Sequence, residues 1–219
     1  MKKLLLSSIL FSLAAGVTAG SLTVSVVDKE GKPVPDAVVV VVPANKSVLP
    51  KTPLPALASI TQEKMQFVPA VTLVPVGAKV SFINMDPWDH HVRSSPAGLG
   101  QFNAAKAGFE IRLEGKPEGK SAKRSEVTLD KAGVMDATLL GCFLHGSMRG
   151  YIFATESPWA VKTLTDGVAV FDDLPDGVAQ VKVWQADQVV DLAPQSFNVS
   201  ATPGKISVEL SVTPRRRRV

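Results

Sequence analysis

An all-β fold is predicted by three features of this sequence. Short runs of β-branched and other apolar residues recur along the chain, and turn-forming segments separate them. Several of these runs alternate apolar with polar residues, which is typical of a strand with one buried face. The chain also contains 16 glycines and 16 prolines, which argue against long helices. Many short strands with regular turn signals favour Greek-key β-sandwiches.

The first elements are expected before residue 60. Residues 22–26 alternate apolar with polar side chains, so they predict a half-buried strand. Residues 28–33 have the composition of a turn. Residues 37–42 form a continuous, mostly β-branched run, which predicts a buried strand. Residues 45–57 contain three prolines and no period, and we expect them to form a connection.

Further strands are expected at intervals along the rest of the chain. The alternation is clearest in the last of them, where Ile206, Val208 and Leu210 are separated by polar residues. Residues 98–121, rich in glycine and lysine, predict a long loop. The expected strands are 71–74, 79–83, 90–93, 125–129, 134–140, 151–154, 168–171, 180–184 and 205–212.

The N-terminus has the pattern of an export signal. Lys2 and Lys3 precede an apolar stretch, residues 4–17, that is too short to span a bilayer. Small residues up to Ala19 predict cleavage before Gly20, which leaves 200 of the 219 residues. An uncleaved membrane anchor is the alternative. No later stretch is apolar enough to cross a membrane, so we expect a mature chain without a membrane span in the periplasm.

Charge gives little support for a nucleic-acid partner. The net charge is +4, of which the two N-terminal lysines contribute half, and residues 215–218 form a run of four arginines. The body of the mature chain is therefore close to neutral. A run of this kind can bind nucleic acid or an anionic membrane, but no other basic cluster with aromatics accompanies it. We expect a solvated basic tail over residues 214–219 and no nucleic-acid binding.

Cys142, His145 and Met148 lie within one short stretch and predict a metal site. Cys142 is the only cysteine, and an unpaired thiol is a liability in an exported protein. Thiolate, imidazole and thioether form a soft ligand set that suits copper. Zinc is an alternative, although thioether is a poor zinc ligand. Taken singly, a buried cysteine or methionine is most often only core filling.

A fourth ligand is available from the pair His90 and His91, about fifty residues upstream. Side chains alternate along a strand, so only one of the two histidines can face the site. If Val92 points into the core, His90 points inward and His91 becomes a surface residue. The predicted ligands are therefore His90, Cys142, His145 and Met148. We expect the last three to lie in one tight turn between strands, with His90 arriving on a neighbouring strand and closing the site across the sandwich.

Two separated motifs resemble the metal site of cupredoxins, the type 1 blue copper family. The first runs from Phe67-x-Pro69 through Asn84-x-Asp86 to His90-x-Val92, and the second from Cys142 to Ile152. The ligand loop, with two residues in each gap, is similar to that of amicyanin. The chain also resembles plastocyanin-like proteins and, most of all, periplasmic cupredoxin-containing proteins labelled methylamine utilization protein. Leu140 and Leu144 depart from the aromatic and the proline that many cupredoxins carry there.

The resemblance implies one type 1 copper ion, single-electron transfer, and a redox partner that is a haem or copper protein. Two histidines and the thiolate would form a trigonal plane, with Met148 as a weak axial ligand. Asn84 and Asp86 are expected to fix the loop before His90 through backbone hydrogen bonds. We expect Phe143 and Leu144, like Trp88, to be packing or surface-patch residues. The electron is expected to pass through His145 inside an apolar patch that also includes Gly146, with Arg149 as a positive rim.

The flanks resemble a carboxypeptidase-regulatory-like or transthyretin-like β-sandwich. Residues 26–38 match the opening of that module, and residues 165–177 match its later part. The cupredoxin would then be inserted into a small transthyretin-like β-sandwich; the alternative is that both flanks only extend the cupredoxin sheets. The expected divisions are a signal peptide 1–19, sandwich segments 20–58 and 156–213 around a cupredoxin domain 59–155, and the tail 214–219.

Three function classes remain open at this point. The first is a periplasmic one-electron carrier, and the second is a copper-handling protein whose site does not cycle. The third is a non-redox adhesion or carbohydrate-binding module with a decayed metal site. An enzyme is not expected, because a four-ligand site leaves no open position for a substrate and the sequence shows no nucleophile–base set. The absence of methionine-rich stretches favours the carrier over the copper handler.

Overall fold

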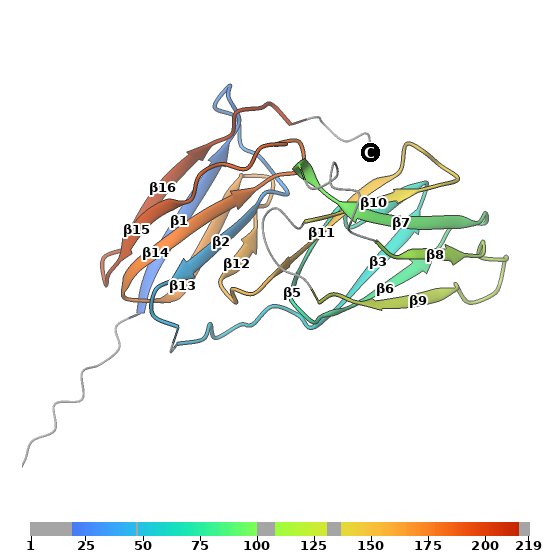
Figure 1. The fold of residues 1–219 in the computed structure, drawn as a ribbon, viewed down its shortest axis with the longest axis horizontal. Helices are drawn as coiled ribbons and strands as arrows, with labels where there is room; N and C mark the ends of the chain where they lie inside the picture. The colour runs from blue at the N-terminus through green and yellow to red at the C-terminus, as the bar shows by residue number, and fades with distance from the viewer. Residues whose placement is uncertain (1–18, 47, 100–107, 131–136, 215–219) are drawn as a thin grey trace, which may run out of the picture.

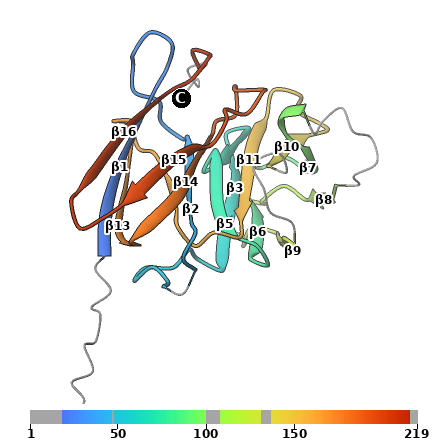
Figure 2. The same ribbon diagram turned by 60° about the vertical axis from the view of Figure 1, so that its left-hand side comes forward.

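The computed structural model describes residues 19–46, 48–99, 108–130 and 137–214. These residues form strands and connecting turns and contain no α-helix, so the predicted all-β class is confirmed. Sixteen strands, numbered in chain order, make up four sheets in this described part of the chain. Figure 1 shows the sheets gathered into two sandwiches that lie side by side, and the turned view in Figure 2 agrees.

The flanking sandwich is built from both ends of the chain. Its three-stranded sheet has the order β13-β1-β16, and its four-stranded sheet has the order β12-β2-β14-β15. The apolar faces of these sheets, including Leu22, Val39 and Phe171, enclose one core. The strands are β1 (Ala19–Val27), β2 (Val38–Pro43), β12 (Ala160–Lys162), β13 (Val168–Pro175), β14 (Gly177–Trp184), β15 (Gln195–Val199) and β16 (Gly204–Glu209).

The second sandwich is built from the middle of the chain and contains the segments with the four predicted metal ligands, so we call it the ligand sandwich. Its sheets have the orders β5-β11-β10-β7-β8 and β4-β3-β6-β9. A second core lies between them and includes Phe82, Val92 and Leu140. The strands are β3 (Leu57–Glu63), β4 (Gln66–Val68), β5 (Val71–Pro75), β6 (Lys79–Asn84), β7 (His90–Pro96), β8 (Glu110–Leu113), β9 (Arg124–Thr128), β10 (Thr138–Cys142) and β11 (Arg149–Thr155).

A third apolar cluster joins the two sandwiches. The Trp184 ring lies 5.5 Å from the rings of both Tyr151 and Phe153. Lys162 on β12 donates a hydrogen bond to the carbonyl oxygen of Val71 on β5, at 3.1 Å. Strands from both ends of the chain pair in the flanking sandwich, and strands from the middle of the chain form the other sandwich. The domain boundaries themselves stay a prediction.

Several strands escaped sequence prediction, and the expected loop at residues 98–121 was wrong in part. It contains β8, whose Ile111 and Leu113 are buried while Arg112 is exposed. Strands β3, β4, β12 and β15 were also not predicted. Most of these strands are short or lie at sheet edges, where fewer side chains are buried and the apolar pattern is weak. The expected strand at 134–140 corresponds to β10, and residues 134–136 lie outside the described residues.

The predicted export signal and the arginine run also lie outside the described residues, apart from their boundary residues. Within the described ranges, no helix has the length and apolar character needed to cross a membrane.

Candidate metal centre

Three of the four predicted ligands converge on one point. The Nδ1 atoms of His90 and His145 lie 3.2 Å apart. The Sγ atom of Cys142 lies 3.6 Å from the His90 Nδ1 and 3.5 Å from the His145 Nδ1. His90 and Cys142 are buried, and His145 is partly exposed. These three residues form a group that could hold a metal ion.

The triangle of donor atoms has the size of a metal site. The point equidistant from the three atoms lies about 2.0 Å from each, close to the length of a metal–imidazole bond. Without an ion, one shared proton could satisfy the two ring nitrogens but would leave the thiol with only weak hydrogen bonds. A soft metal ion would satisfy all three donors together, so the donor set fits copper.

The strand-to-strand turn after β10 positions Cys142, His145 and Met148. Cys142 ends β10, and Met148 directly precedes β11. The turn is closed by the Met148 N–H, which donates to the His145 carbonyl oxygen at 3.0 Å. The Phe143 N–H donates to the His91 carbonyl oxygen at 2.9 Å and ties the turn to β7. The expected tight turn is therefore present, and we call residues 142–148 the ligand loop.

Met148 lies in the same apolar cluster as Cys142, with 1% of its surface exposed. Its place at the end of the ligand loop is compatible with an axial role, which stays a prediction.

His90 reaches the site from β7, which pairs with β10 in the same sheet. Cys142 lies opposite Val92 in this register, so His90 is on the neighbouring strand, two residues from that pair. The expected neighbouring strand is therefore confirmed, whereas the expected closure across the sandwich was wrong, because both strands belong to one sheet. Adjacent strands lie only about 4.8 Å apart, so a ligand from the next strand can reach the thiol directly.

The alternation between His90 and His91 is confirmed. His90 and Val92 are each 0% exposed, whereas the side chain of His91 is 29% exposed. His91 is more than a solvated surface residue, because its ring lies 5.9 Å from that of Phe143. Its Nε2 also lies 3.3 Å from the carboxylate of Glu110 on β8.

The Asp86 carboxylate contacts the Nε2 side of the His90 ring, and the sequence analysis did not predict this contact. Its Oδ2 lies 2.9 Å from the His90 Nε2, on the side of the ring away from Cys142. The same carboxylate accepts the N–H groups of Lys64, at 2.6 Å, and Met65, at 3.0 Å. Burial opposes ionisation, but the hydrogen bonds from Met65, His90 and Lys64 outweigh it and lower the pKa of Asp86.

An ionised Asp86 selects the tautomer of His90. A carboxylate can only accept a hydrogen bond, so the Nε2 of His90 must carry the proton. In the neutral ring, Nδ1 then presents its lone pair toward Cys142 and His145. The only sequence signal for this role was the four-residue spacing between Asp86 and His90.

Asn84 fixes the segment before His90, as expected. Its side-chain amide donates to the carbonyl oxygens of Trp88, Leu113 and Glu114, at 2.8, 3.2 and 3.0 Å. Its Oδ1 accepts the Asp86 N–H at 2.9 Å. The fully buried Asn84 therefore joins this segment to the end of β8 and sets the position of Asp86.

The outer face of the ligand loop is apolar and exposed. Phe143 is 67% exposed and Leu144 is 51% exposed. The guanidinium carbon of Arg93 lies 5.4 Å from the centre of the Phe143 ring. We call Phe143 and Leu144 the loop patch. Trp88, 44% exposed, is likewise a surface residue.

These features define an all-β protein with a candidate metal centre of two histidines and one cysteine. No family model and no curated protein matches the chain. Among solved structures, a Cu(I) amicyanin variant aligns at 21% identity over 45% of this chain and 82% of that chain, with a TM-score of 0.35.

Two further amicyanin structures give similar values. A reduced Cu(I) variant at pH 4 aligns at 22% identity over 50% of this chain and 99% of that chain, with a TM-score of 0.34. Amicyanin from Paracoccus versutus aligns at 17% identity over 52% of this chain and 96% of that chain, with the same TM-score. This likeness is too weak to establish membership of a family.

Proposed function

We propose that this protein is a periplasmic one-electron carrier with a single type 1 copper ion. The observation that carries the proposal is the convergence of His90 Nδ1, Cys142 Sγ and His145 Nδ1 within 3.6 Å of one another. His90, Cys142 and His145 would hold the ion, with Met148 as a fourth, weaker ligand. Bound copper would supply a Cu(I)/Cu(II) couple that gains and loses one electron.

The chain's own residues restrain the donor atoms. Cys142 is held by the pairing of β10 with β7 and β11, and the ligand loop is closed by its backbone hydrogen bonds. Asp86 fixes the ring of His90. Donors held in this way need little rearrangement when the charge at the site changes, and a small rearrangement favours fast transfer.

The loop patch supports a route for the electron to a haem or copper protein. His145 belongs to the donor set and is itself partly exposed, next to the exposed Phe143 and Leu144. Redox encounters bury little area and must dissociate quickly, which a small apolar patch allows. The proposed role includes no catalysis, because a four-ligand site would leave no position for a substrate.

Optical and electron paramagnetic resonance spectra of the copper-loaded protein test this proposal. The cupric protein should be intensely coloured through thiolate-to-copper charge transfer and should show a narrow copper hyperfine splitting. Cys142→Ser should abolish the colour. Only weak colour in the copper-loaded wild-type protein would overturn the type 1 assignment. That result would favour a copper-handling protein.

A further inference from the structure

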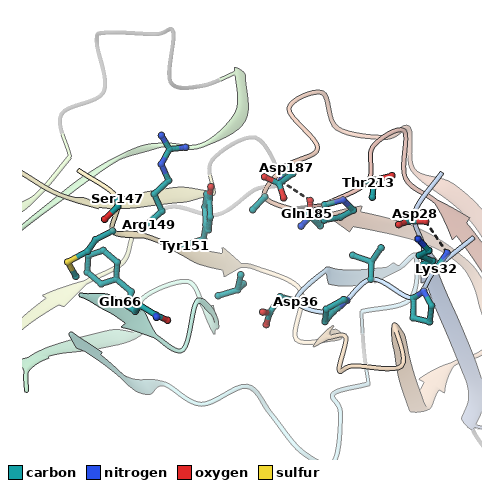
Figure 3. A pocket seen from close by; sticks show the side chains of 18 of the residues that line it. Asp28, Lys32, Asp36, Gln66, Ser147, Arg149, Tyr151, Gln185, Asp187 and Thr213 are labelled. Carbon is teal, nitrogen blue, oxygen red and sulfur yellow. Dashed lines mark hydrogen bonds between the residues drawn. The ribbon is translucent and has the colours of Figure 1, made fainter. Parts of the chain in front are cut away.

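A cleft of about 1050 Å³ lies between the two sandwiches beside the ligand loop. Figure 3 shows Ser147, Arg149 and Gln66 on its ligand-sandwich wall, with Gln185 and Asp28 on the opposite wall. The volume reaches the upper end of the range for ligand pockets, about 300–1,000 Å³. The cleft exists only because the flanking sandwich stands next to the ligand loop.

Most charged groups on the flanking wall already have partners. Asp28 accepts the N–H groups of Glu30 and Lys32, at 2.8 and 2.9 Å. Asp36 pairs with Lys162 at 2.8 Å, and Lys32 pairs with Glu30 at 2.7 Å. Asp36 and Lys32 are thus neutralised within the protein, and the Asp28 carboxylate accepts hydrogen bonds from the backbone.

The ligand-sandwich wall carries cations without such partners. Lys64 and Arg149 both line the cleft, and both are exposed. Neither side chain forms an ion pair with another residue in the ranges that the structure describes. The remaining acidic group of the lining, Asp187, has an interaction of its own. An exposed guanidinium and an ammonium on one wall favour a ligand that carries carboxylates.

The wall that carries these cations is linked to the candidate metal centre. Lys64 and Met65 form the two-residue turn between β3 and β4, with φ values of 51° and 59°. A two-residue hairpin turn of this type requires positive φ at both residues. Asp86 holds this turn and also contacts His90. Met148 lines the cleft as well, so an occupant would touch the supports of the site.

We propose that this cleft binds an acidic segment of a partner polypeptide, whose carboxylates pair with Lys64 and Arg149. The described chain ends at Pro214, which lines the cleft, and four arginines follow in the sequence. If the partner is a redox protein, this inference rests on the proposed carrier function. Binding of an acidic segment in the cleft does not itself depend on that function.

The test measures binding of a fluorescently labelled oligoglutamate peptide to the full chain, by fluorescence anisotropy at low salt. An oligoglutamine peptide of the same length is the peptide control. Lys64→Gln and Arg149→Gln should each weaken binding about fivefold, the effect of losing one exposed ion pair. Lys79→Gln should leave binding unchanged. Lys79 is also exposed, but it lies on β6 opposite Leu57, at the end of β3 away from Lys64.

Four outcomes would overturn the proposal. One is the absence of peptide binding, and another is equal weakening by Lys79→Gln, which would indicate nonspecific attraction. A third is binding that is lost on truncation after Pro214 yet unaffected by Lys64→Gln and Arg149→Gln. The fourth is competition by inorganic phosphate at the same concentration as the peptide, which would identify a small-anion site.

The measurement is made on both the metal-free and the copper-loaded chain. Peptide binding by a protein that lacks the expected copper spectrum would contradict the proposed function and leave the cleft proposal standing. The expected spectrum without peptide binding would do the reverse.

Discussion

Replacement of Asp86 by asparagine should destabilise the protein far more than a surface carboxylate change does. Asp86 is 4% exposed, and its two oxygens accept from Lys64, Met65 and His90. Asparagine offers one acceptor oxygen and an NH₂ group that would face a donor. With hydrogen bonds to charged groups contributing about 1.5–3 kcal/mol each, we expect a loss of about 2–4 kcal/mol in the free energy of unfolding.

Urea denaturation of the metal-free protein measures this loss, and Asp89→Asn is the matched control. Asp89 lies in the same segment, but it accepts from the Gly115 N–H and the exposed Arg112. Its replacement should cost much less, because a solvent-exposed ion pair contributes little to stability. Met65→Gly in the Asp86→Asn background should recover about 1 kcal/mol, because glycine adopts positive φ without strain. Equal losses for Asp86→Asn and Asp89→Asn would refute the reasoning.

The effect of Asp86 should depend on pH in a defined direction. Its folded pKa lies below the usual value of 3.8, so the carboxylate stabilises the fold above that pH. This contribution is lost as the pH falls through the folded pKa, where the carboxyl becomes protonated. The difference in unfolding free energy between wild type and Asp86→Asn should therefore be constant near neutral pH and shrink in acid. A difference that grew below pH 3.8 would contradict the assigned ionisation.

Three further predictions concern the copper-loaded protein. Met148→Leu should keep the colour and raise the reduction potential, because an apolar axial side disfavours the cupric form; complete loss of copper binding would show a structural role instead. His90→Ala should weaken cupric binding in a titration, while His91→Ala should leave the spectrum nearly unchanged, and the reverse result would reject the assigned ligand. Leu144→Glu should slow electron exchange with the partner, measured by stopped flow, without altering spectrum or potential. An unchanged rate would exclude the loop patch as the docking surface.

Local patterns carried much of the information about the fold and the donor residues. Alternation along a strand assigned His90 to the interior and His91 to the surface, because successive side chains point to opposite faces. The spacing of Cys142 and His145 indicated one turn between strands. Strand β15 gave no usable pattern, because an edge strand buries few side chains. Strand β8 does alternate, but the glycine- and lysine-rich residues around it predicted a loop.

By itself, the sequence determined the all-β class, the strand that carries His90, and the donors that one short loop can bring together. Only the tertiary structure decided that Asp86 joins His90 to the turn at Lys64 and Met65. It also decided that the flanking sandwich closes a cleft beside Arg149. The physical reason is range: side-chain periodicity is a property of neighbouring residues, whereas sheet order and packing between sandwiches depend on contacts between distant segments.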